Sequence, residues 1–136
     1  MLYFAYGSNL YHKQMKKRCR QSIYIKCFIL KNYKLFFRNS FLGGGVADVE
    51  KRKNSKVLGA LYKITKKDEK KLDIYEDYPI LYKKIYFTYN NKKIMTYTMC
   101  KKTSFTYPTE KYLNVVKRGY KDCKLNNKYL IKALKS

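Results

Sequence analysis

Histidine and paired cysteines are scarce in this chain of 136 residues, which limits the chemistry that it can support. His12 is the only histidine, so sites built from several histidines, including most transition-metal sites, are excluded; we expect it on the surface of a lysine-rich helix. The four cysteines, Cys19, Cys27, Cys100 and Cys123, lack the C-x-x-C spacing of zinc and redox sites. We therefore expect reduced thiols, mostly in apolar surroundings, with no metal and no cofactor.

Long hydrophobic runs are lacking as well. No apolar stretch approaches the length that spans a membrane, and the N-terminus does not resemble an export signal. We therefore predict a cytoplasmic protein that does not enter a membrane. The hydrophobic content of 46% is typical of a folded protein, and the length suits a single domain over residues 1–136.

Negative charge is the third scarcity. Nine acidic residues stand against 32 lysines and arginines, which gives a formal net charge of +23. Such a field attracts anions and permits nonspecific contact with nucleic acid. However, the lysines are spread over every segment, arginine is scarce and no nucleic-acid-binding motif is present. Lysine, asparagine, isoleucine and tyrosine have AT-rich codons, so we favour compositional bias as the cause of the charge over nucleic-acid binding.

The first ten residues join a short apolar run to a polar turn. Residues 2–6 predict a buried strand, and the pattern becomes helical after the turn. Gly7 lets a ligand approach the backbone closely, while Ser8 and Asn9 are frequent in turns and at helix starts. A strand that ends there leaves backbone N–H groups free to hold an anion or a carbonyl oxygen. The alternative is a structural corner without a ligand.

Hydrophobic patterns predict the remaining elements. Thr65 and Asp68 are spaced as a helix capping box, and Asn90-Asn91 predicts a hairpin turn. Residues 41–45 contain three glycines but no following Gly-Lys-Ser/Thr, so we expect a flexible corner near the site rather than a phosphate loop. Strands are expected at 22–37 (one long bent strand or two short ones with a break near 31–32), 56–64, 82–89 and 93–100, and helices at 10–19, from 65, at 109–120 and at 127–134. The pattern predicts an α+β fold whose mixed sheet closes toward a barrel.

Glu76 is the acidic residue best placed for chemistry. It lies four residues after Leu72, on the inward side of the predicted helix, and Pro79 ends that helix shortly afterwards. The helix dipole, the charges of Asp73 and Asp77, and a partly apolar, hydroxyl-lined setting are expected to raise the pKa of Glu76 toward the range useful for general acid–base catalysis. The tyrosines that provide this setting are Tyr75, Tyr78 and Tyr82, while the lysine-rich field opposes the rise. The alternative is a surface glutamate at an acidic helix end.

Three segments of the chain resemble segments of the γ-glutamylcyclotransferase-like family and occur in the same order as in that family. The first is residues 6–10, Tyr-Gly-Ser-Asn-Leu. The second is residues 72–79 with Tyr82, which resembles the LD-x-x-E segment that carries the family's catalytic glutamate. The third resembles its C-terminal helical region, with Pro108-Thr109, Tyr112, Gly119 and residues 129–130. The resemblance spans nearly the whole chain and implies a small α+β, barrel-like domain with flanking helices.

The resemblance implies an enzyme that closes the γ-glutamyl group of a small compound to 5-oxoproline and releases the amine. The substrate class stays open among γ-glutamyl amino acids, γ-glutamyl amines and carrier-linked γ-glutamyl groups, and the positive charge slightly favours an anionic substrate or an acidic carrier protein. Glu76 is the implied catalytic residue. The implied substrate-binding groups are the backbone N–H groups of Gly7, Ser8, Asn9 and Leu10 and the side chains of Tyr6, Tyr82, Tyr97 and Tyr112.

One departure from the family pattern is Asp77, since many members have glycine after the catalytic glutamate. This residue is expected to alter the local backbone or the proton affinity of Glu76. The alternative function is that of a noncatalytic binding protein on the same fold. Such a protein would use the pocket for a small ligand and the basic surface for nucleic acid or an acidic protein.

Overall fold

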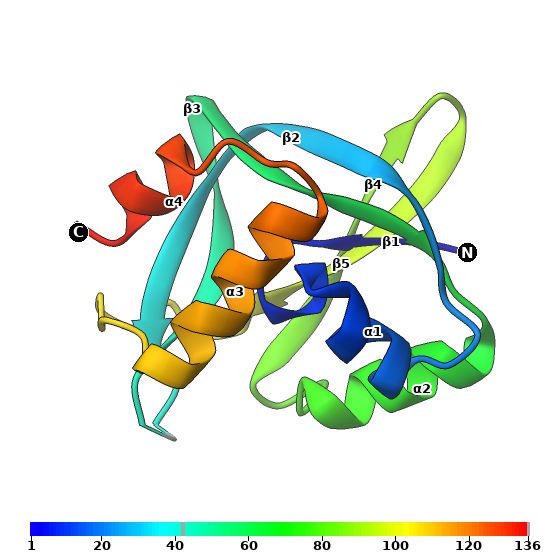
Figure 1. Ribbon diagram of the computed structural model, residues 1–136, viewed down its shortest axis with the longest axis horizontal. Coiled ribbons are helices and arrows are strands. Elements are labelled where there is room, and N and C mark those ends of the chain that lie inside the picture. The colour runs from blue at the N-terminus through cyan, green and yellow to red at the C-terminus, as the bar shows by residue number, and fades with distance from the viewer. Residues whose placement is uncertain (42, 136) are drawn as a thin grey trace.

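The computed structural model describes residues 1–41 and 43–135, which fold around a five-stranded mixed sheet (Figure 1). The elements are β1 (Leu2–Ala5), a 3-10 helix (Ser8–Leu10), α1 (His12–Arg18), β2 (Ile23–Asn39), β3 (Gly45–Lys63), α2 (Lys66–Tyr75), β4 (Tyr82–Tyr89), β5 (Lys92–Met99), α3 (Glu110–Asp122) and α4 (Lys128–Ala133). The strand order is β2-β3-β1-β5-β4, with β1 antiparallel to β3 and parallel to β5. The N-terminal strand therefore lies at the centre of the sheet.

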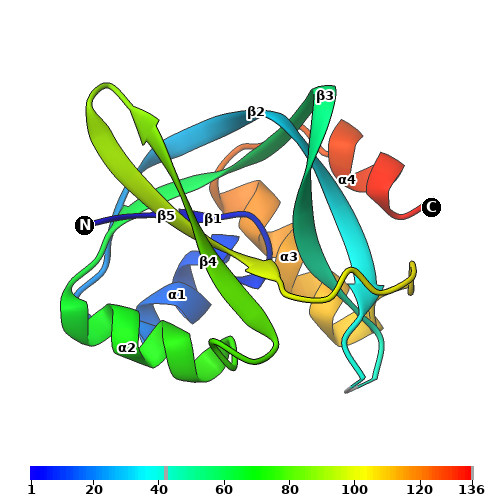
Figure 2. The same ribbon diagram turned by 180° about the vertical axis from the view of Figure 1, so that it is seen from behind.

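The fold is α+β with a mixed sheet, as predicted, but the sheet is not closed into a barrel. β2 and β4 are its two edges. Side chains bridge these edges, since the Phe28 ring of β2 lies 6.1 Å from the Phe87 ring and 5.0 Å from the Tyr89 ring of β4. Rings inserted between strands hold them farther apart than the roughly 4.8 Å spacing of a hydrogen-bonded ladder. Figures 1 and 2 show the curved sheet with α1 and α3 on one side of it.

The two long strands account for the main differences from the predicted elements. β2 is one continuous strand, and its pairing with β3 shifts register between Lys31 and Tyr33, where Asn32 has a φ of 63°. The predicted break is therefore a bulge that bends a single strand. The predicted strand at 56–64 is only the second half of the 19-residue β3, which begins at Gly45. Leu42, part of the predicted glycine loop, lies outside the described residues.

The predicted helix at 10–19 is divided into two pieces. A 3-10 turn at Ser8–Leu10 is followed by extended backbone at Tyr11 and then by α1. The Leu10 side chain is fully buried against α3, where a Cβ on Gly119 would lie 2.4 Å from the Leu10 Cβ. Only glycine permits this approach, so α3 holds the turn after β1 in place.

Other local predictions are confirmed. The Thr65 Oγ1 accepts a hydrogen bond from the Asp68 N–H (3.1 Å), and the Asp68 carboxylate accepts one from the Thr65 N–H (3.2 Å), which completes the capping box of α2. Asn90 and Asn91 have φ values of 50° and 61°, as the β4–β5 hairpin requires. No helix in the described chain is long and apolar enough to cross a membrane.

The histidine and the cysteines differ in part from expectation. The His12 ring is half-buried rather than on the surface, 4.5 Å from the Tyr24 ring and with Nε2 3.4 Å from the Cys123 sulfur. All four cysteines are free thiols, as expected, but Cys27 and Cys100 are exposed instead of lying in apolar surroundings. Among the described residues, no group of histidine, cysteine and acidic side chains is arranged to hold a metal ion.

Candidate active site

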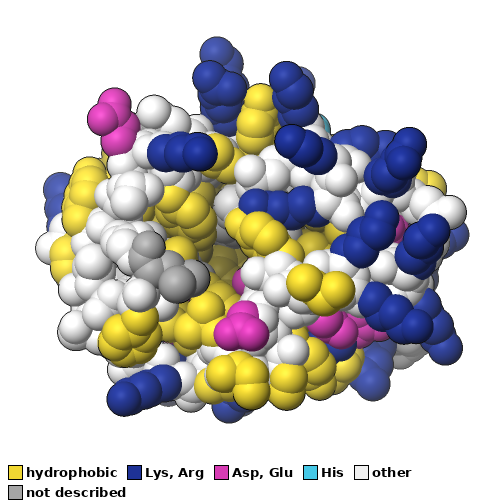
Figure 3. All heavy atoms as spheres, turned by 90° about the horizontal axis from the view of Figure 1, so that it is seen from below, with side chains coloured by type: hydrophobic (Ala, Val, Ile, Leu, Met, Phe, Trp, Pro, Cys, Tyr) yellow, Lys and Arg dark blue, Asp and Glu magenta, His cyan; other side chains and the backbone are white. Residues whose placement is uncertain are grey.

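A pocket of about 230 Å³ lies between the turn after β1, the start of β3 and the end of α2. Figure 3 shows the face on which it opens, where hydrophobic side chains line a hollow and an acidic side chain stands at its edge. The pocket brings together residues from both ends and the middle of the chain. The predicted site residues that line it are Tyr6, Gly7, Ser8, Asn9, Glu76, Tyr82, Tyr97 and Tyr112.

The turn after β1 presents backbone donors to the pocket. In the part of the chain that the structure describes, the N–H groups of Gly7, Ser8 and Asn9 donate no hydrogen bond to another protein group. Leu10 differs from the prediction, since its N–H donates to the Gly7 carbonyl (3.1 Å) and its side chain lies in the core. Leu10 therefore supports the turn and does not line the pocket.

Close packing explains the glycine in this turn. A Cβ on Gly7 would lie 3.1 Å from the Ala47 Cβ and 3.2 Å from the Tyr112 hydroxyl. Both distances are tighter than ordinary contacts, so any side chain at this position would push β3 and α3 away from the turn. Gly7 thus keeps the backbone donors next to the hydroxyl of Tyr112.

Side chains around the turn fix its conformation. The Asn9 amide donates to the Tyr3 hydroxyl (3.0 Å), and the Tyr62 hydroxyl donates to the Asn9 carbonyl (2.9 Å). Arg18, at the end of α1, donates to the Asn9 side-chain oxygen (2.6 Å) and to the Ser8 hydroxyl (3.2 Å). The side chains of Ser8 and Asn9 are therefore engaged with the scaffold, which leaves their backbone N–H groups for a ligand.

Tyrosine hydroxyls hold the walls of the pocket together. Tyr6 donates to the Tyr97 carbonyl (2.7 Å), Tyr82 donates to the Ala47 carbonyl (2.9 Å), and Tyr97 donates to the Asp73 carboxylate (2.5 Å). Burial is the main cause that raises the pKa of each of these three hydroxyls, so they stay neutral near pH 7. They connect β1, β3, β4, β5 and α2 around one cavity.

Two other tyrosines keep a proton to donate. The Tyr112 hydroxyl accepts a hydrogen bond from the Ala47 N–H (3.1 Å), and the Tyr3 hydroxyl accepts from Asn9. Neither hydroxyl donates to another described group, so each can donate to a ligand in the pocket. Sequence reasoning missed Tyr3 as a site residue, although it lies in β1 only three positions before the Tyr-Gly-Ser-Asn turn. It placed Tyr75 in the setting of Glu76 but did not assign it to substrate binding. The other lining residues that it missed are Ser40, Val46, Ala47, Leu81 and Thr96.

Glu76 caps the C-terminus of α2 and lines the pocket. No group in the described chain donates a hydrogen bond to its carboxylate. Burial raises the pKa of Glu76 to about 7, and the positive charge of Arg18 partly opposes this rise. The direction of the shift agrees with the sequence-based expectation. Of the expected causes, the apolar setting corresponds to the burial that raises the pKa, whereas the neighbouring acids do not contribute.

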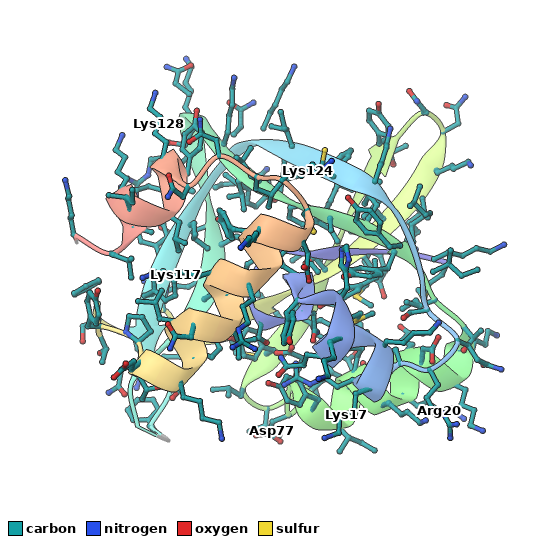
Figure 4. All side chains as sticks on the ribbon, viewed as in Figure 1. Lys17, Arg20, Asp77, Lys117, Lys124 and Lys128 are labelled. Atoms are coloured by element: carbon teal, nitrogen blue, oxygen red, sulfur yellow. The ribbon has the colours of Figure 1, made fainter. Side chains whose placement is uncertain are left out.

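The neighbouring acids are occupied or exposed. Asp73 accepts the Tyr97 hydrogen bond and forms an ion pair with Lys84 (2.9 Å). Asp77 is exposed, has a φ of 51°, and lies at the outer edge of the fold in Figure 4. Glu76 is thus the carboxylate that the fold turns into the pocket.

Comparison with known proteins identifies the family. The family model described as gamma-glutamyl cyclotransferase, AIG2-like, matches residues 3–119. The chain therefore belongs to the gamma-glutamyl cyclotransferase, AIG2-like family. None of the curated protein sequences compared with this chain matches it.

Solved structures share the fold. An uncharacterized human protein is 28% identical with a TM-score of 0.83, over 99% of this chain and 86% of that chain. A structure named gamma-glutamyl cyclotransferase is 25% identical with a TM-score of 0.82, over 99% of this chain and 86% of the other. The Bacillus subtilis protein YkqA, at 21% identity and a TM-score of 0.83, shares the fold over 100% of this chain and 54% of its own.

Proposed function

We propose that this protein is a γ-glutamyl cyclotransferase that converts a small γ-glutamyl compound to 5-oxoproline and releases the amine. The observation that carries the proposal is Glu76, a carboxyl without a hydrogen-bond partner among the described residues, whose pKa burial raises to about 7. A carboxyl with such a pKa exchanges protons readily in both directions near neutral pH. Membership of the cyclotransferase family supports the same reaction.

The reaction is intramolecular. The α-amine of the γ-glutamyl group attacks its own γ-carbonyl carbon, which forms the ring C–N bond, and the C–N bond to the leaving amine then breaks. The Glu76 carboxylate accepts the first proton, which the α-ammonium must lose before it attacks, and gives a proton to the leaving nitrogen as the C–N bond breaks. The ring nitrogen loses its second proton when it becomes the lactam N–H, and the released amine takes up this proton and leaves as an ammonium ion. Protons therefore balance over one turnover, and Glu76 ends in its starting form.

The turn after β1 supplies the complementary donors. The free N–H groups of Gly7, Ser8 and Asn9 would bind either the α-carboxylate of the substrate or the oxyanion that develops on the γ-carbonyl oxygen. Tyr3 and Tyr112 add hydroxyl donors on the same wall. Tyr6, Tyr82 and Tyr97 shape the cavity through their bonds to the scaffold, so their role would be to orient the folded glutamyl group.

The test is release of 5-oxoproline from a panel of γ-glutamyl amino acids, γ-glutamyl amines, glutathione and a carrier-linked γ-glutamyl group. We expect wild type to release 5-oxoproline from at least one class and Glu76→Gln to lose about 10²–10⁴-fold in rate, the usual contribution of general acid–base catalysis. Asp77→Asn is the matched control, because it removes a neighbouring carboxylate outside the pocket.

Equal turnover by wild type and Glu76→Gln would contradict the assigned role of Glu76. Saturable binding of γ-glutamyl compounds without any release of 5-oxoproline would instead support a noncatalytic binding protein. In that case, a nucleic-acid partner would be recognised by a steep loss of binding as salt rises, which turnover of a small substrate would not show.

A further inference from the structure

The guanidinium of Arg18 contacts lining residues of the pocket from two different elements, the turn after β1 and the end of α2. Arg18 is the last residue of α1 and is half-buried. Its Nη1 lies 2.6 Å from the Asn9 side-chain oxygen and 3.2 Å from the Ser8 hydroxyl, in the turn after β1. Its central carbon lies 3.2 Å from the centre of the Tyr75 ring, and Tyr75 directly precedes Glu76. Arg18 thus joins the residues that carry the backbone donors to the end of the helix that carries the carboxyl.

The other ionisable groups around Glu76 do not balance its charge. From β1, β4, β5 and α3, the residues that interact with Glu76 are tyrosines, and burial raises the pKa of each, so they are neutral near pH 7; they are Tyr3, Tyr6, Tyr82, Tyr97 and Tyr112. From α2, Asp73 is paired with Lys84, and Asp77, next in the chain, faces outward. From α1, Arg18 supplies the positive charge that opposes the effect of burial on Glu76.

Arginine suits this place for two reasons. Burial lowers the pKa of Arg18, but a guanidinium still stays protonated near neutral pH, so its charge does not vary while Glu76 exchanges protons. Its planar form also lets one face stack on Tyr75 while an edge nitrogen donates to Ser8 and Asn9. A lysine would keep the charge but could not make the stacked and hydrogen-bonded contacts together.

We propose that Arg18 is a positioning residue of this site, which fixes Ser8 and Asn9 at the pocket wall and places a positive charge beside the end of α2 that carries Glu76. The proposal deepens the proposed function and rests on it for its catalytic consequence. Arg18 does not line the pocket, so it acts through Ser8, Asn9, Tyr75 and the field at Glu76.

Three variants separate the two parts of this role. Arg18→Met removes both the charge and the hydrogen bonds. Arg18→Lys retains the charge and loses the stacked, hydrogen-bonded arrangement. Arg20→Met removes the same unit of charge from an exposed residue just after α1, which points to solvent in Figure 4, and serves as the matched control.

The first readout is the pKa of Glu76, measured by NMR titration of a ¹³C-labelled carboxyl in the substrate-free protein. We expect it to rise by about one pH unit in Arg18→Met, because an opposite charge nearby is lost, and to stay near the wild-type value in Arg18→Lys and Arg20→Met. The same pKa in wild type and Arg18→Met would overturn the electrostatic part. If Arg18→Met does not fold, Arg18→Lys tests the electrostatic part alone. A Glu76 pKa near the wild-type value in Arg18→Lys supports this part, and a rise of about one pH unit, although the positive charge is retained, overturns it.

The second readout is the pH profile of kcat/KM for 5-oxoproline release. In Arg18→Met, the acidic limb should move to higher pH by the same amount as the Glu76 pKa. In Arg18→Lys, the limb should stay in place while kcat/KM falls about tenfold at every pH, since Ser8 and Asn9 lose their hydrogen bonds. An unchanged kcat/KM in Arg18→Lys would overturn the positioning part.

The two readouts distinguish this proposal from the proposed function. If wild type releases no 5-oxoproline but the Glu76 pKa still rises in Arg18→Met, the cyclotransferase assignment is wrong and the electrostatic role of Arg18 holds. If wild type is active and neither the pKa nor the pH profile responds to Arg18→Met, the function holds and the role of Arg18 is wrong.

Discussion

Asp48 is a fully buried carboxylate and Glu76 a half-buried one that lines the pocket, and the two differ in the hydrogen bonds that the protein gives them. One Asp48 oxygen contacts Arg38 Nε and Lys102 Nζ, each at 2.8 Å, and the other accepts hydrogen bonds from the Thr98 hydroxyl and the Met99 N–H, each at 2.8 Å. The Glu76 carboxylate receives no hydrogen bond from the described residues. The charge of Asp48 is thus neutralised by protein donors, whereas Glu76 is left with a raised proton affinity. Of the two, only Glu76 is available for proton transfer.

The two sites are mechanically connected through Ala47. This residue precedes Asp48 in β3, and its N–H and carbonyl groups bind the hydroxyls of Tyr112 and Tyr82 in the pocket wall. The donors around Asp48 come from β2, β5 and the segment after β5. The fully hydrogen-bonded Asp48 therefore directly follows the residue on which two tyrosine hydroxyls of the pocket wall are anchored.

The largest expected change in unfolding free energy comes from replacing Asp48, the carboxylate with a full set of protein partners. Asp48→Asn leaves Arg38 and Lys102 facing a neutral amide, and breaking a buried ion pair costs about 3–5 kcal/mol of unfolding free energy. We expect the lower end, about 3 kcal/mol, because Lys102 can turn to solvent. Urea unfolding at pH 7 measures this loss.

Glu50→Gln is the control for Asp48→Asn. Glu50 also pairs with Arg38, but its side chain is 36% exposed, so its loss should cost less than about 1 kcal/mol. Similar losses of unfolding free energy in the two variants would mean that the buried hydrogen bonds and ion pairs of Asp48 stabilise the fold no more than the exposed ion pair of Glu50.

A smaller effect of opposite sign is expected at the unsatisfied carboxylate. The folded protein holds the Glu76 proton more tightly than the unfolded chain, so wild type loses stability as the pH rises from the ordinary value of 4.5 to about 7. Glu76→Gln avoids this loss and should be more stable than wild type above pH 7, by up to about 3 kcal/mol. Below pH 4.5 the difference should vanish.

Urea unfolding of wild type and Glu76→Gln at pH 4, 6 and 8 measures this dependence. A stability difference that does not vary with pH would show that burial does not raise the proton affinity of Glu76. The expected gain in stability together with the loss of activity would be the signature of a carboxyl kept for chemistry at a cost to the fold.

The smallest effect is expected at Asp77. Because burial, and not the neighbouring acids, raises the Glu76 pKa, Asp77→Asn should leave that pKa within a few tenths of a unit. Asparagine tolerates the positive φ of this position, so the unfolding free energy should change by less than about 0.5 kcal/mol. NMR titration of Glu76 in this variant decides whether burial or the charge of Asp77 raises the pKa. A large fall in the Glu76 pKa would show that Asp77 raises it.

Much of this protein could be predicted from its sequence because the relevant signals are local. The capping box at Thr65, the Asn90-Asn91 hairpin and the Tyr-Gly-Ser-Asn turn each depend on residues a few positions apart. Glu76 could be singled out from its spacing to Leu72 and Pro79 only together with the resemblance of residues 72–79 to the family's LD-x-x-E segment. The first half of β3 escaped prediction because its short buried stretch, residues 45–49, is followed by exposed, mostly polar residues at 51–54, and pairing with β2 keeps the whole segment extended.

Only the tertiary structure decided what surrounds these residues. Glu76 has a raised pKa because β1, β4, β5 and α3 exclude water around it, and no spacing in the chain encodes that burial. Tyr3, Tyr75 and Arg18 reach the site through contacts that side-chain packing creates. The sequence by itself determined which carboxyl and which turn belong to the proposed site. The packing of distant segments determined the proton affinity of that carboxyl and left the backbone donors of that turn without protein partners.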